Sequence, residues 1–444
     1  MRILHIAAHL GGGAGKAISG MAVQGQELYS DQHRVLLLQA PEKDGYVQTC
    51  RENGVPVDVW TGGGALQWAD VIVVSWWNHP VMAGFLHELP PVSTPLLLWS
   101  HVNGCHYPML PYPFAATFEG LLLTSPYSLE NPMWTGPERE QIQKHAEIVW
   151  GMGRFAPEEI APKTGYQNRR TFTIGYVGTL NYGKLHPQFL SYCKAVCEKL
   201  PAARFVMAGD RDGALERDVR LADLEDRFSF PGYVADVPAL MRSFDAFGYL
   251  LNPEHYGTTE NVVLEAMACG VPVVALRQNA ERLIVPPEAG YLVGTPQHYA
   301  DRMEALSRSP ALRERLGQNA RAHVLKRYDL EENTARFRRA CRQAESGPRR
   351  SHSFSFLGAS PWDWFLFCLG ERERNLMQEA ERLLNTGAFP QLRRLLQSCP
   401  PILREERKSS LRHFAAVYPQ DRTLQGLKQQ MEQESHYGGN QTEL

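Results

Sequence analysis

Short apolar runs alternate with amphipathic, helix-length segments along the first 276 residues of the chain. The runs are continuous and bounded by Gly or Pro, as in RILHIAAH (2–9) and VPVVAL (271–276). Runs of this kind, separated by helices, are typical of buried parallel strands in βαβ units. The pattern therefore predicts an α/β fold in which ligands bind at the carboxyl ends of the strands.

Two series of such runs follow one another. The first ends at AEIVW (146–150), and a polar stretch rich in Pro and Gly (151–170) indicates a crossing between domains. In the second series we expect strands at 171–180, 204–210, 227–234, 245–251 and 271–276, and helices at 186–199, 213–224, 236–243 and 259–269. Two successive sheets of similar size predict a pair of doubly wound, Rossmann-like domains that face each other across a cleft.

From about residue 300 the sequence becomes helical and rich in Arg, and SGPRRSHSFSF (346–356) interrupts it. We therefore predict an N-terminal domain over 1–150, a second domain over 151–345 and a helical appendage over 351–436. The arginines of 302–350 are most simply a solvated helical face, with a peripheral contact to the inner face of a membrane as the alternative.

The composition excludes several classes of protein. Forty-six Lys and Arg balance 48 Asp and Glu, so no overall basic field attracts nucleic acid. The eight cysteines include no C-x-x-C pair, which argues against a zinc ribbon or a thioredoxin-type site. No apolar run reaches about 18 residues, and the first one is too short for a signal peptide. We expect a cytoplasmic protein.

The segment PEHYGTTENVVLEAMACGVPVVA (253–275) carries the most chemical information. Its loop GTT leads into an expected helix whose first amides point toward the loop, an arrangement that attracts anions. Thr259 can cap this helix, which places Glu260 and Asn261 in the first turn and Glu265 one to two turns further on. The residues alone thus predict an anion site.

This segment closely resembles the second nucleotide-binding half of the retaining GT-B glycosyltransferases of family 4 (glycosyl transferases group 1), which carry an E-x7-E signature and the run EAMACGVPVV. By this resemblance Glu265 matches the second Glu, which binds the ribose of the sugar nucleotide. The first Glu, which helps to hold the donor sugar, falls at Gly257, and Glu260 and Glu254 are the nearby candidates to replace it. The triplet Thr258, Thr259 and Glu260 replaces a Gly–aromatic–Gly loop whose amides contact the donor.

The run GYVGTLNYGKLHP (175–187) resembles the G-R-x-x-x-x-K element of the same family, in which Arg and Lys neutralise the diphosphate. Lys184 fits the Lys, but Thr179 stands at the Arg. A clamp with one cation fewer binds phosphate more weakly unless another residue contributes, and Arg211 is the candidate.

Three further resemblances add candidate site residues. FPGYVADVPALMRSFDAFGYLLNPE is similar to the turn that binds the base, so Tyr233 and Val234 are expected near it. The loop after the first run resembles a Gly-rich loop in which Gly12 and Gly13 let the backbone approach the donor phosphates or the acceptor. His101, at the end of TPLLLWSH, is similar to a His that reaches the donor sugar from the opposing domain.

The resemblance implies a glycosyltransferase that takes a nucleotide diphosphate-sugar, such as a UDP-sugar, and transfers the sugar with retention. Lys184, His101 and Glu260 are the expected catalytic residues. A glycan, a lipid-linked glycan or a protein is the expected acceptor. No acid-rich D-x-D signature appears where a metal would sit in the alternative glycosyltransferase fold, so we expect no metal and no cofactor.

Two alternatives stay open. The missing first Glu and the missing Arg are also compatible with a noncatalytic binding or scaffold protein that keeps the GT-B fold; an epimerase or phosphorylase lacks specific motifs. The helical appendage either docks a protein acceptor, a partner or a second subunit, or simply packs onto the body through its aromatic cluster of Trp362, Trp364, Phe365 and Phe367. Similarly, the Trp76–Trp77 pair either stacks on an acceptor or packs in the core.

Overall fold

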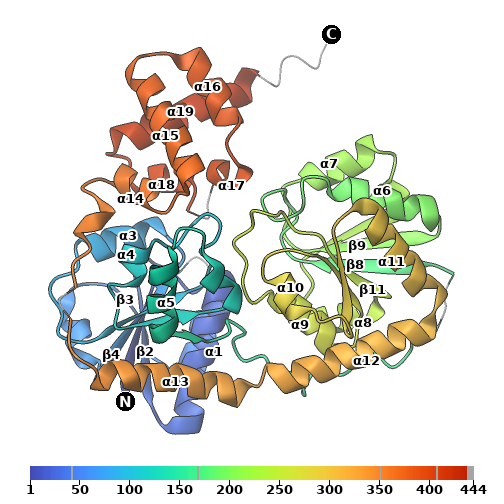
Figure 1. The fold of residues 1–444 in the computed structure, drawn as a ribbon, viewed down its shortest axis with the longest axis horizontal. Helices are drawn as coiled ribbons and strands as arrows, with labels where there is room; N and C mark the ends of the chain where they lie inside the picture. Colours follow the sequence, from blue (N-terminus) through green and yellow to red (C-terminus); the bar gives the residue numbers. More distant parts are fainter. Residues whose placement is uncertain (42–43, 168–169, 351, 407–408, 438–444) are drawn as a thin grey trace. The chain divides into compact units, whose positions relative to one another are not determined.

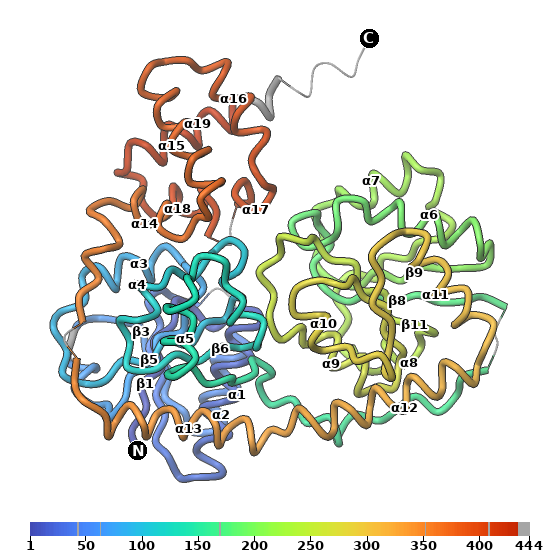
Figure 2. The backbone as a smooth tube through the Cα atoms, viewed as in Figure 1, coloured from blue at the N-terminus to red at the C-terminus, as the bar shows by residue number. Residues whose placement is uncertain are grey.

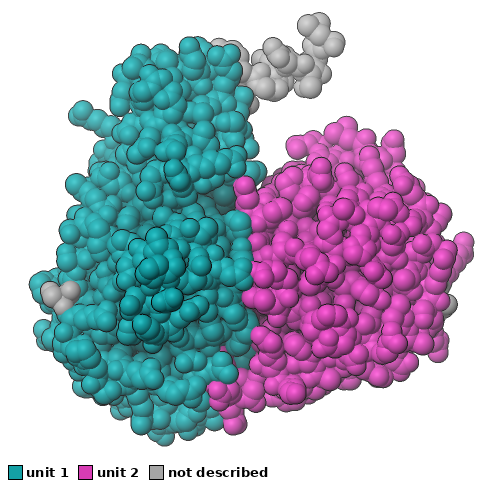
Figure 3. Space-filling model, in the orientation of Figure 1, with its two compact units in different colours: residues 1–153, 334–444 teal, residues 154–333 magenta. Residues whose placement is uncertain are grey.

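The computed structural model describes residues 1–41, 44–167, 170–350, 352–406 and 409–437. Contacts between residues divide the chain into two compact units, which Figure 3 colours separately. Unit 1 comprises Met1–Gly153 and Thr334–Leu444, and unit 2 comprises Arg154–Asn333. Each unit contains its own sheet.

The described part of unit 1 contains a seven-stranded sheet in the order β3-β2-β1-β4-β5-β6-β7, and all neighbouring strands are parallel. Figure 1 shows it with its surrounding helices. The strands are β1 (Arg2–Ala7), β2 (Gln32–Leu37), β3 (Val57–Val59), β4 (Val71–Trp76), β5 (Leu96–Ser100), β6 (Gly120–Leu123) and β7 (Ala146–Ile148). The α-helices between them are α1 (Gly12–Tyr29), α2 (Gly45–Glu52), α3 (Pro80–His87), α4 (Tyr112–Ala115) and α5 (Gly136–His145).

Unit 2 contains a second parallel sheet, in the order β10-β9-β8-β11-β12-β13. Its strands are β8 (Phe172–Val177), β9 (Ala203–Ala208), β10 (Phe228–Gly232), β11 (Ala246–Tyr249), β12 (Val273–Leu276) and β13 (Gly290–Val293). Its helices are α6 (Phe189–Lys199), α7 (Ala214–Leu221), α8 (Val237–Ser243), α9 (Asn261–Ala268), α10 (Glu281–Ile284), α11 (Pro296–Arg308) and α12 (Pro310–Arg327). Helix α6 packs against α11, and α9 packs against α12.

Both sheets are doubly wound, as the alternation of apolar runs predicts. In each, the chain builds outward from a first strand and then reverses, so that β1 and β4 are neighbours in unit 1 and β8 and β11 are neighbours in unit 2. Ligands of such sheets bind where the strand order reverses, in the crevice outside the carboxyl ends. The short strand β13 is an addition to the predicted set. Its burial is mixed, so it shows neither a continuous apolar run nor a clear alternation.

Helix α13 (Leu330–Ser346) continues the chain from unit 2 into unit 1, as the orange tube of Figure 2 shows. Its apolar residues Phe337, Ala340, Cys341 and Ala344 belong to the hydrophobic core of unit 1. For this reason residues 334–345, which the sequence assigns to the second domain, group with unit 1. The three-domain division itself stays a prediction.

The expectation that the arginines of 302–350 form a solvated face is wrong for three of them. Arg313 is buried and donates to the backbone oxygens of Tyr166 (2.8 Å) and Gln167 (3.2 Å). Arg321 donates to the backbone oxygen of Ile160 (2.7 Å), and Arg338 donates to a carboxylate oxygen of Asp31 (2.7 Å). These side chains fasten helices to their own unit, a use that charge content alone does not reveal.

The predicted helical appendage is present. Its described helices are α14 (Pro361–Phe367), α15 (Glu371–Asn385), α16 (Phe389–Gln397), α17 (Pro401–Arg404), α18 (Leu411–Val417) and α19 (Arg422–Tyr437). The Trp364 ring lies 5.0 Å from that of His87 in α3, and the Tyr418 hydroxyl donates to the backbone oxygen of Pro80 (2.8 Å). Trp362, Trp364 and Phe365 are buried, so the aromatic cluster packs the appendage onto the body of unit 1. In the described part of the chain, no helix has the length and apolar character needed to cross a membrane.

Candidate active site

The loops after β8 and β11 meet at the carboxyl edge of the second sheet, where the strand order reverses. Asn252 donates its backbone N–H to the oxygen of Lys184 (2.9 Å), and His186 does the same to Leu250 (3.0 Å). The backbone N–H of Lys184 also donates to Oδ1 of Asn181 (3.0 Å). The backbone of Lys184 is therefore held by both loops.

Lys184 forms an ion pair with Glu260 at the N-terminus of α9. The distance from Nζ to Oε2 is 3.2 Å, and the two side chains are 25% and 3% exposed. The same carboxylate oxygen accepts a hydrogen bond from the buried hydroxyl of Tyr249. Burial alone raises the pKa of Glu260, but Lys184 and the Tyr249 hydroxyl hold that pKa below its usual range. The carboxylate is thus anionic although it is buried.

The predicted cap of α9 is wrong. Helix α9 begins at Asn261, and its N-cap is Glu260, not Thr259. The chain is left-handed at Glu260 (φ 47°), which delays the first helical residue. Consequently Glu260 lies just before the first turn, and its side chain makes no cap hydrogen bond. A left-handed conformation costs a residue with a side chain roughly 1–2 kcal/mol, and such strain concentrates at functional sites.

The Glu260 carboxylate fills the space beside Gly257. A Cβ atom added at Gly257 would lie 1.8 Å from Oε1 of Glu260. Gly257 is the position where the resemblance expects the first Glu. Gly257 itself has no side chain, but a carboxylate nevertheless lies beside it. That carboxylate belongs to Glu260, three residues further along the chain. Of the two candidates, Glu260 rather than the exposed Glu254 contacts Lys184.

Gly257→Ala tests whether this space matters. We expect the added methyl group to displace the Glu260 carboxylate and to lower turnover at least tenfold, because the carboxylate moves away from Lys184. Gly294→Ala is the matched control, since a Cβ there meets nothing within 4 Å. Comparing the steady-state kinetics of both variants checks the prediction, and equal turnover in the two would contradict it.

The remaining predicted residues of unit 2 lie in the loops of the same edge. Thr258 and Thr259 are buried, whereas Asn261 and Glu265 in α9 and Thr179 after β8 are partly exposed. Arg211 follows β9, where its backbone bridges to Leu180 of the β8 loop. The guanidinium of Arg211 pairs with Glu216 (3.1 Å). In the described part of the chain, Arg211 therefore makes no ion pair with Glu260 beside Lys184. Tyr233 and Val234 follow β10, and Tyr233 is 85% exposed.

In unit 1 the predicted residues also lie at the carboxyl ends of strands. Gly12 begins α1 directly after the loop that follows β1, with φ 58°, and a Cβ at Gly12 or Gly13 would meet nothing within 4 Å. His101 follows β5, and its ring centre lies 4.7 Å from that of Trp99 in a tilted arrangement and 6.0 Å from that of Trp77 edge to face. Burial, followed by the nearby His5, lowers the pKa of His101 to about 3. The ring is therefore neutral near pH 7.

The structure supports core packing for the tryptophan pair, because Trp77 also packs against the hydrophobic core of unit 1. Trp76 is buried against Phe114 (5.4 Å), which is core packing. Trp77 is partly buried and lies beside the rings of His9 (5.3 Å) and His79 (6.1 Å) at the strand ends.

Three residues that sequence reasoning missed belong to the site of unit 2. Tyr249 ends β11, His255 lies in the loop after it, and Glu281 begins α10. They look like ordinary strand, loop and helix residues in the sequence. The available signal was that two of them lie within eleven residues of Glu260. In the described part of the chain, no group of three or more His, Cys, Asp or Glu side chains is placed to hold a metal ion.

Comparisons with known proteins show what the chain and its fold are similar to. Residues 171–309 match the family described as Glycosyl transferases group 1. The chain is 30% identical over 199 residues to the Bacillus subtilis protein named as glycosyltransferase EpsD, which covers 42% of this chain and 51% of that protein. It is 31% identical over 122 residues to N-acetyl-alpha-D-glucosaminyl L-malate synthase of Bacillus anthracis. This match covers 27% of the present chain and 31% of the synthase. The matched regions thus span about half and a third of these curated relatives.

Among solved structures, Anabaena HepE in complex with UDP and glucose superposes with a TM-score of 0.60 at 18% identity. The match covers 76% of this chain and 98% of HepE. At this identity the likeness shows the fold, and that fold is GT-B. Residues 171–309 thus match the glycosyl transferases group 1 family, and the two sheets of the chain have the GT-B fold.

Proposed function

We propose that this protein transfers a sugar from a nucleoside diphosphate-sugar to an acceptor, with retention of the anomeric configuration. The observation that carries the proposal is the Lys184–Glu260 pair, which lies at the reversal of strand order and in front of α9. A cation and the N-terminus of a helix suit a diphosphate, and a buried anionic carboxylate suits the hydroxyls of a sugar.

Lys184 can serve both parts of such a donor. Its ammonium group has three protons, and the contact with Glu260 uses one of them. The other two are then available for phosphate oxygens, and the partly exposed side chain leaves room for their approach. When the bond to the sugar breaks, negative charge grows on the β-phosphate. Lys184 and the amides at the start of α9 stabilise that charge because they are already in place.

Glu260 takes the part that the resemblance gives to the first Glu of the family signature. Its carboxylate would accept a hydrogen bond from a hydroxyl of the donor sugar, since Oε1 has no hydrogen-bond partner among the described residues. Glu265, one turn into α9, would bind the ribose, and the exposed Tyr233 with Val234 would contact the base. By the resemblance, His101 is a further candidate for contact with the sugar, and its imidazole is neutral near pH 7. Retention rests on the family resemblance alone.

The identity of the donor and the acceptor is proposed by chemical class. UDP and UDP-glucose are bound in the HepE structures, which favours a UDP-sugar as the donor. A glycan, a lipid-linked glycan or a protein is the proposed acceptor, and no metal or cofactor is required.

Binding of nucleotides tests the donor class directly. We expect UDP or a UDP-sugar, at about 100 times its Kd, to stabilise the protein by about 2.7 kcal/mol, which raises the Tm of unit 2 by roughly 5–10 °C. Differential scanning calorimetry of the full chain with UDP-, GDP-, ADP- and dTDP-sugars measures this shift. No shift with any of them would refute the proposal. A shift without turnover on any acceptor would favour the noncatalytic alternative, which the Thr at position 179 and the Arg211–Glu216 pair also favour.

A further inference from the structure

The loops after β11 and β12 bring a histidine and a second buried carboxylate behind Glu260. His255 is 2% exposed, and Glu281, the first residue of α10, is fully buried. The two strands are parallel neighbours, so their carboxyl ends lie side by side. His255 Nδ1 lies 3.6 Å from Oε1 of Glu260, and His255 Nε2 lies 3.0 Å from Oε1 of Glu281. The imidazole therefore lies between two carboxylates.

The hydrogen bonds define which imidazole nitrogen carries the proton. The backbone N–H of Gly257 donates to Nδ1 of His255 (3.0 Å), so Nδ1 acts as an acceptor. The proton then lies on Nε2, which donates to Glu281. A carboxylate partner of this kind fixes both the tautomer and the orientation of an imidazole. Glu281 thus orients His255, and His255 orients the amide of Gly257, whose missing side chain leaves space for Glu260.

Stability alone gives little reason for this arrangement. Taking a carboxylate out of water costs several kcal/mol, and a well-packed apolar residue is often as stable or more stable at such a position. Glu281 receives hydrogen bonds from His255 and from Nε2 of Gln278 (3.4 Å), but its Oε2 has no hydrogen-bond partner among the described residues. A buried, incompletely satisfied carboxylate that is linked to a strained site residue indicates a functional constraint.

We propose that Glu281 and His255 are positioning residues that hold Glu260 in place for the donor sugar; this inference rests on the proposed function. Lys184 and Tyr249 hold Oε2 of Glu260 from one side, and His255 with Gly257 limits Oε1 from the other. A bound diphosphate would share Lys184 with Glu260 and so loosen this ion pair. The His255–Glu281 arrangement keeps the loop, and with it the carboxylate, in position when Lys184 is shared.

The test separates the sugar from the nucleotide. Glu260 faces the sugar part of the donor, so UDP alone does not need it, whereas a UDP-sugar does. We expect Glu281→Gln and His255→Leu to lower kcat/KM for the UDP-sugar roughly tenfold to a hundredfold. The Kd of UDP, measured by titration calorimetry on the full chain, should change less than twofold. His255→Asn can still accept from Gly257 through its side-chain oxygen and should recover part of the loss.

Glu288→Gln is the matched control, because Glu288 is an exposed carboxylate of the same unit. Kinetics equal to the wild type in both Glu281→Gln and His255→Leu would overturn the inference. An equal loss of UDP and UDP-sugar binding in the folded variants would also overturn it, since that result indicates a purely structural role. Should the wild-type protein bind no nucleotide at all, the proposed function fails instead.

Discussion

Lys184→Ala is expected to lower kcat/KM by about 10²–10³-fold, which corresponds to roughly 2.7–4 kcal/mol of lost transition-state stabilisation. Two effects combine. In the proposed function the diphosphate loses the cation that meets its growing charge, and the carboxylate of Glu260 loses the partner at 3.2 Å that helps to keep its pKa low. Steady-state kinetics with the donor that binds most tightly measure this loss.

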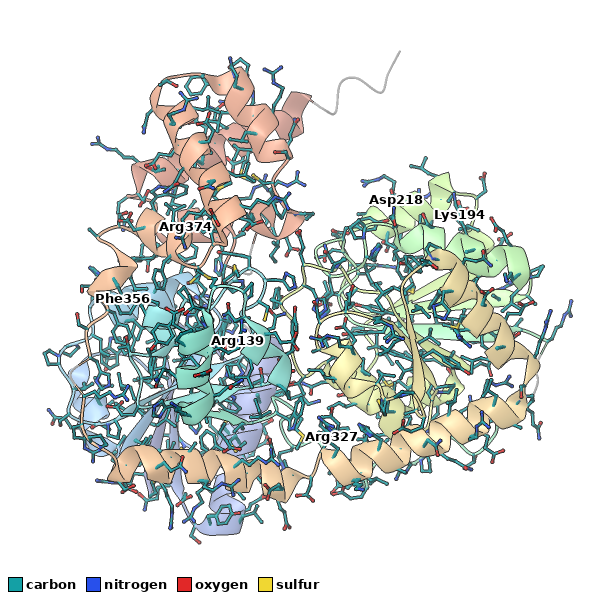
Figure 4. The ribbon with its side chains drawn as sticks, viewed as in Figure 1. Arg139, Lys194, Asp218, Arg327, Phe356 and Arg374 are labelled. Atoms are coloured by element: carbon teal, nitrogen blue, oxygen red, sulfur yellow. The ribbon has the colours of Figure 1, made fainter. Side chains whose placement is uncertain are left out.

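Lys194→Ala serves as the control for this prediction. Lys194 is an exposed lysine of the same unit, on α6, and Figure 4 labels it. It contributes the same formal charge but lies outside the loops of the strand-order reversal, so its variant should keep wild-type kinetics. A Lys184→Ala protein with unchanged kcat/KM would contradict the assignment. Glu260→Gln, which keeps the shape of the side chain, shows whether the charge of the carboxylate is needed as well.

The fold was predictable because apolar runs buried in parallel sheets have a clear pattern. In unit 2, each of the five predicted strands and four predicted helices corresponds to an observed element, with ends that differ by a few residues. The alternation of strands and helices also implies the doubly wound order. It does not reveal where α13 packs, since Phe337 could cover either sheet and only tertiary contacts place it in the core of unit 1.

The sequence predicted a site residue only where two features were visible in it: a charged side chain and a position close to the end of a strand. Lys184 and Glu260 are of this kind, and the structure brings them together. Arg211 was a candidate because it is a cation after a strand, but an acidic neighbour, Glu216, pairs with it. The sequence alone cannot decide whether an exposed cation such as Arg211 binds a ligand phosphate or a neighbouring carboxylate.

The start of α9 shows a second limit. Ser and Thr are preferred N-caps, so Thr259 was the natural choice. The preference amounts to about 1 kcal/mol, and the buried contacts of Glu260 with Lys184 and Tyr249 outweigh it. The left-handed backbone at Glu260 is the consequence, and no local sequence rule predicts it. His255 and Glu281 are missed for a related reason, because their role depends on contacts between loops of different strands.

Unit 1 is expected to lose stability steeply in mild acid. His5 in β1 and His33 in β2 are buried side by side, with 2.9 Å between Nε2 and Nδ1. Burial, followed by the N-terminal ammonium group, lowers the pKa of His33 to about 3, and burial with His33 lowers that of His5 well below its usual value. Burial, with His413 and His9 nearby, lowers the pKa of His79 to about 2. Each of these side chains is neutral in the folded state at pH 5.

The sign follows from proton counting. An unfolded histidine binds a proton near pH 6.5, whereas these folded ones do not, so the unfolded state takes up more protons as the pH falls. Their stabilising contribution is complete above pH 6.5 and is lost progressively between about pH 6.5 and 3. With a folded pKa of about 3, protonation of His33 in the unfolded chain costs the folded state about 2 kcal/mol at pH 5, and His5 and His79 add losses in the same direction. Together these losses are a large part of the roughly 5–15 kcal/mol that stabilises a typical domain.

Tryptophan fluorescence can follow this loss in unit 1 separately, because all the tryptophans of the chain belong to that unit. They are Trp60, Trp68, Trp76, Trp77, Trp99, Trp134, Trp150, Trp362 and Trp364. We expect the urea midpoint of the fluorescence transition to fall strongly from pH 7.5 to pH 5. Replacing both His5 and His33 by Leu removes two proton-binding groups from the unfolded chain, so the fall should become smaller by their share. His145→Gln, at an exposed position, should leave it unchanged. An equally steep fall in the double variant would contradict the prediction. It would show that groups other than the buried His5–His33 pair cause the acid sensitivity.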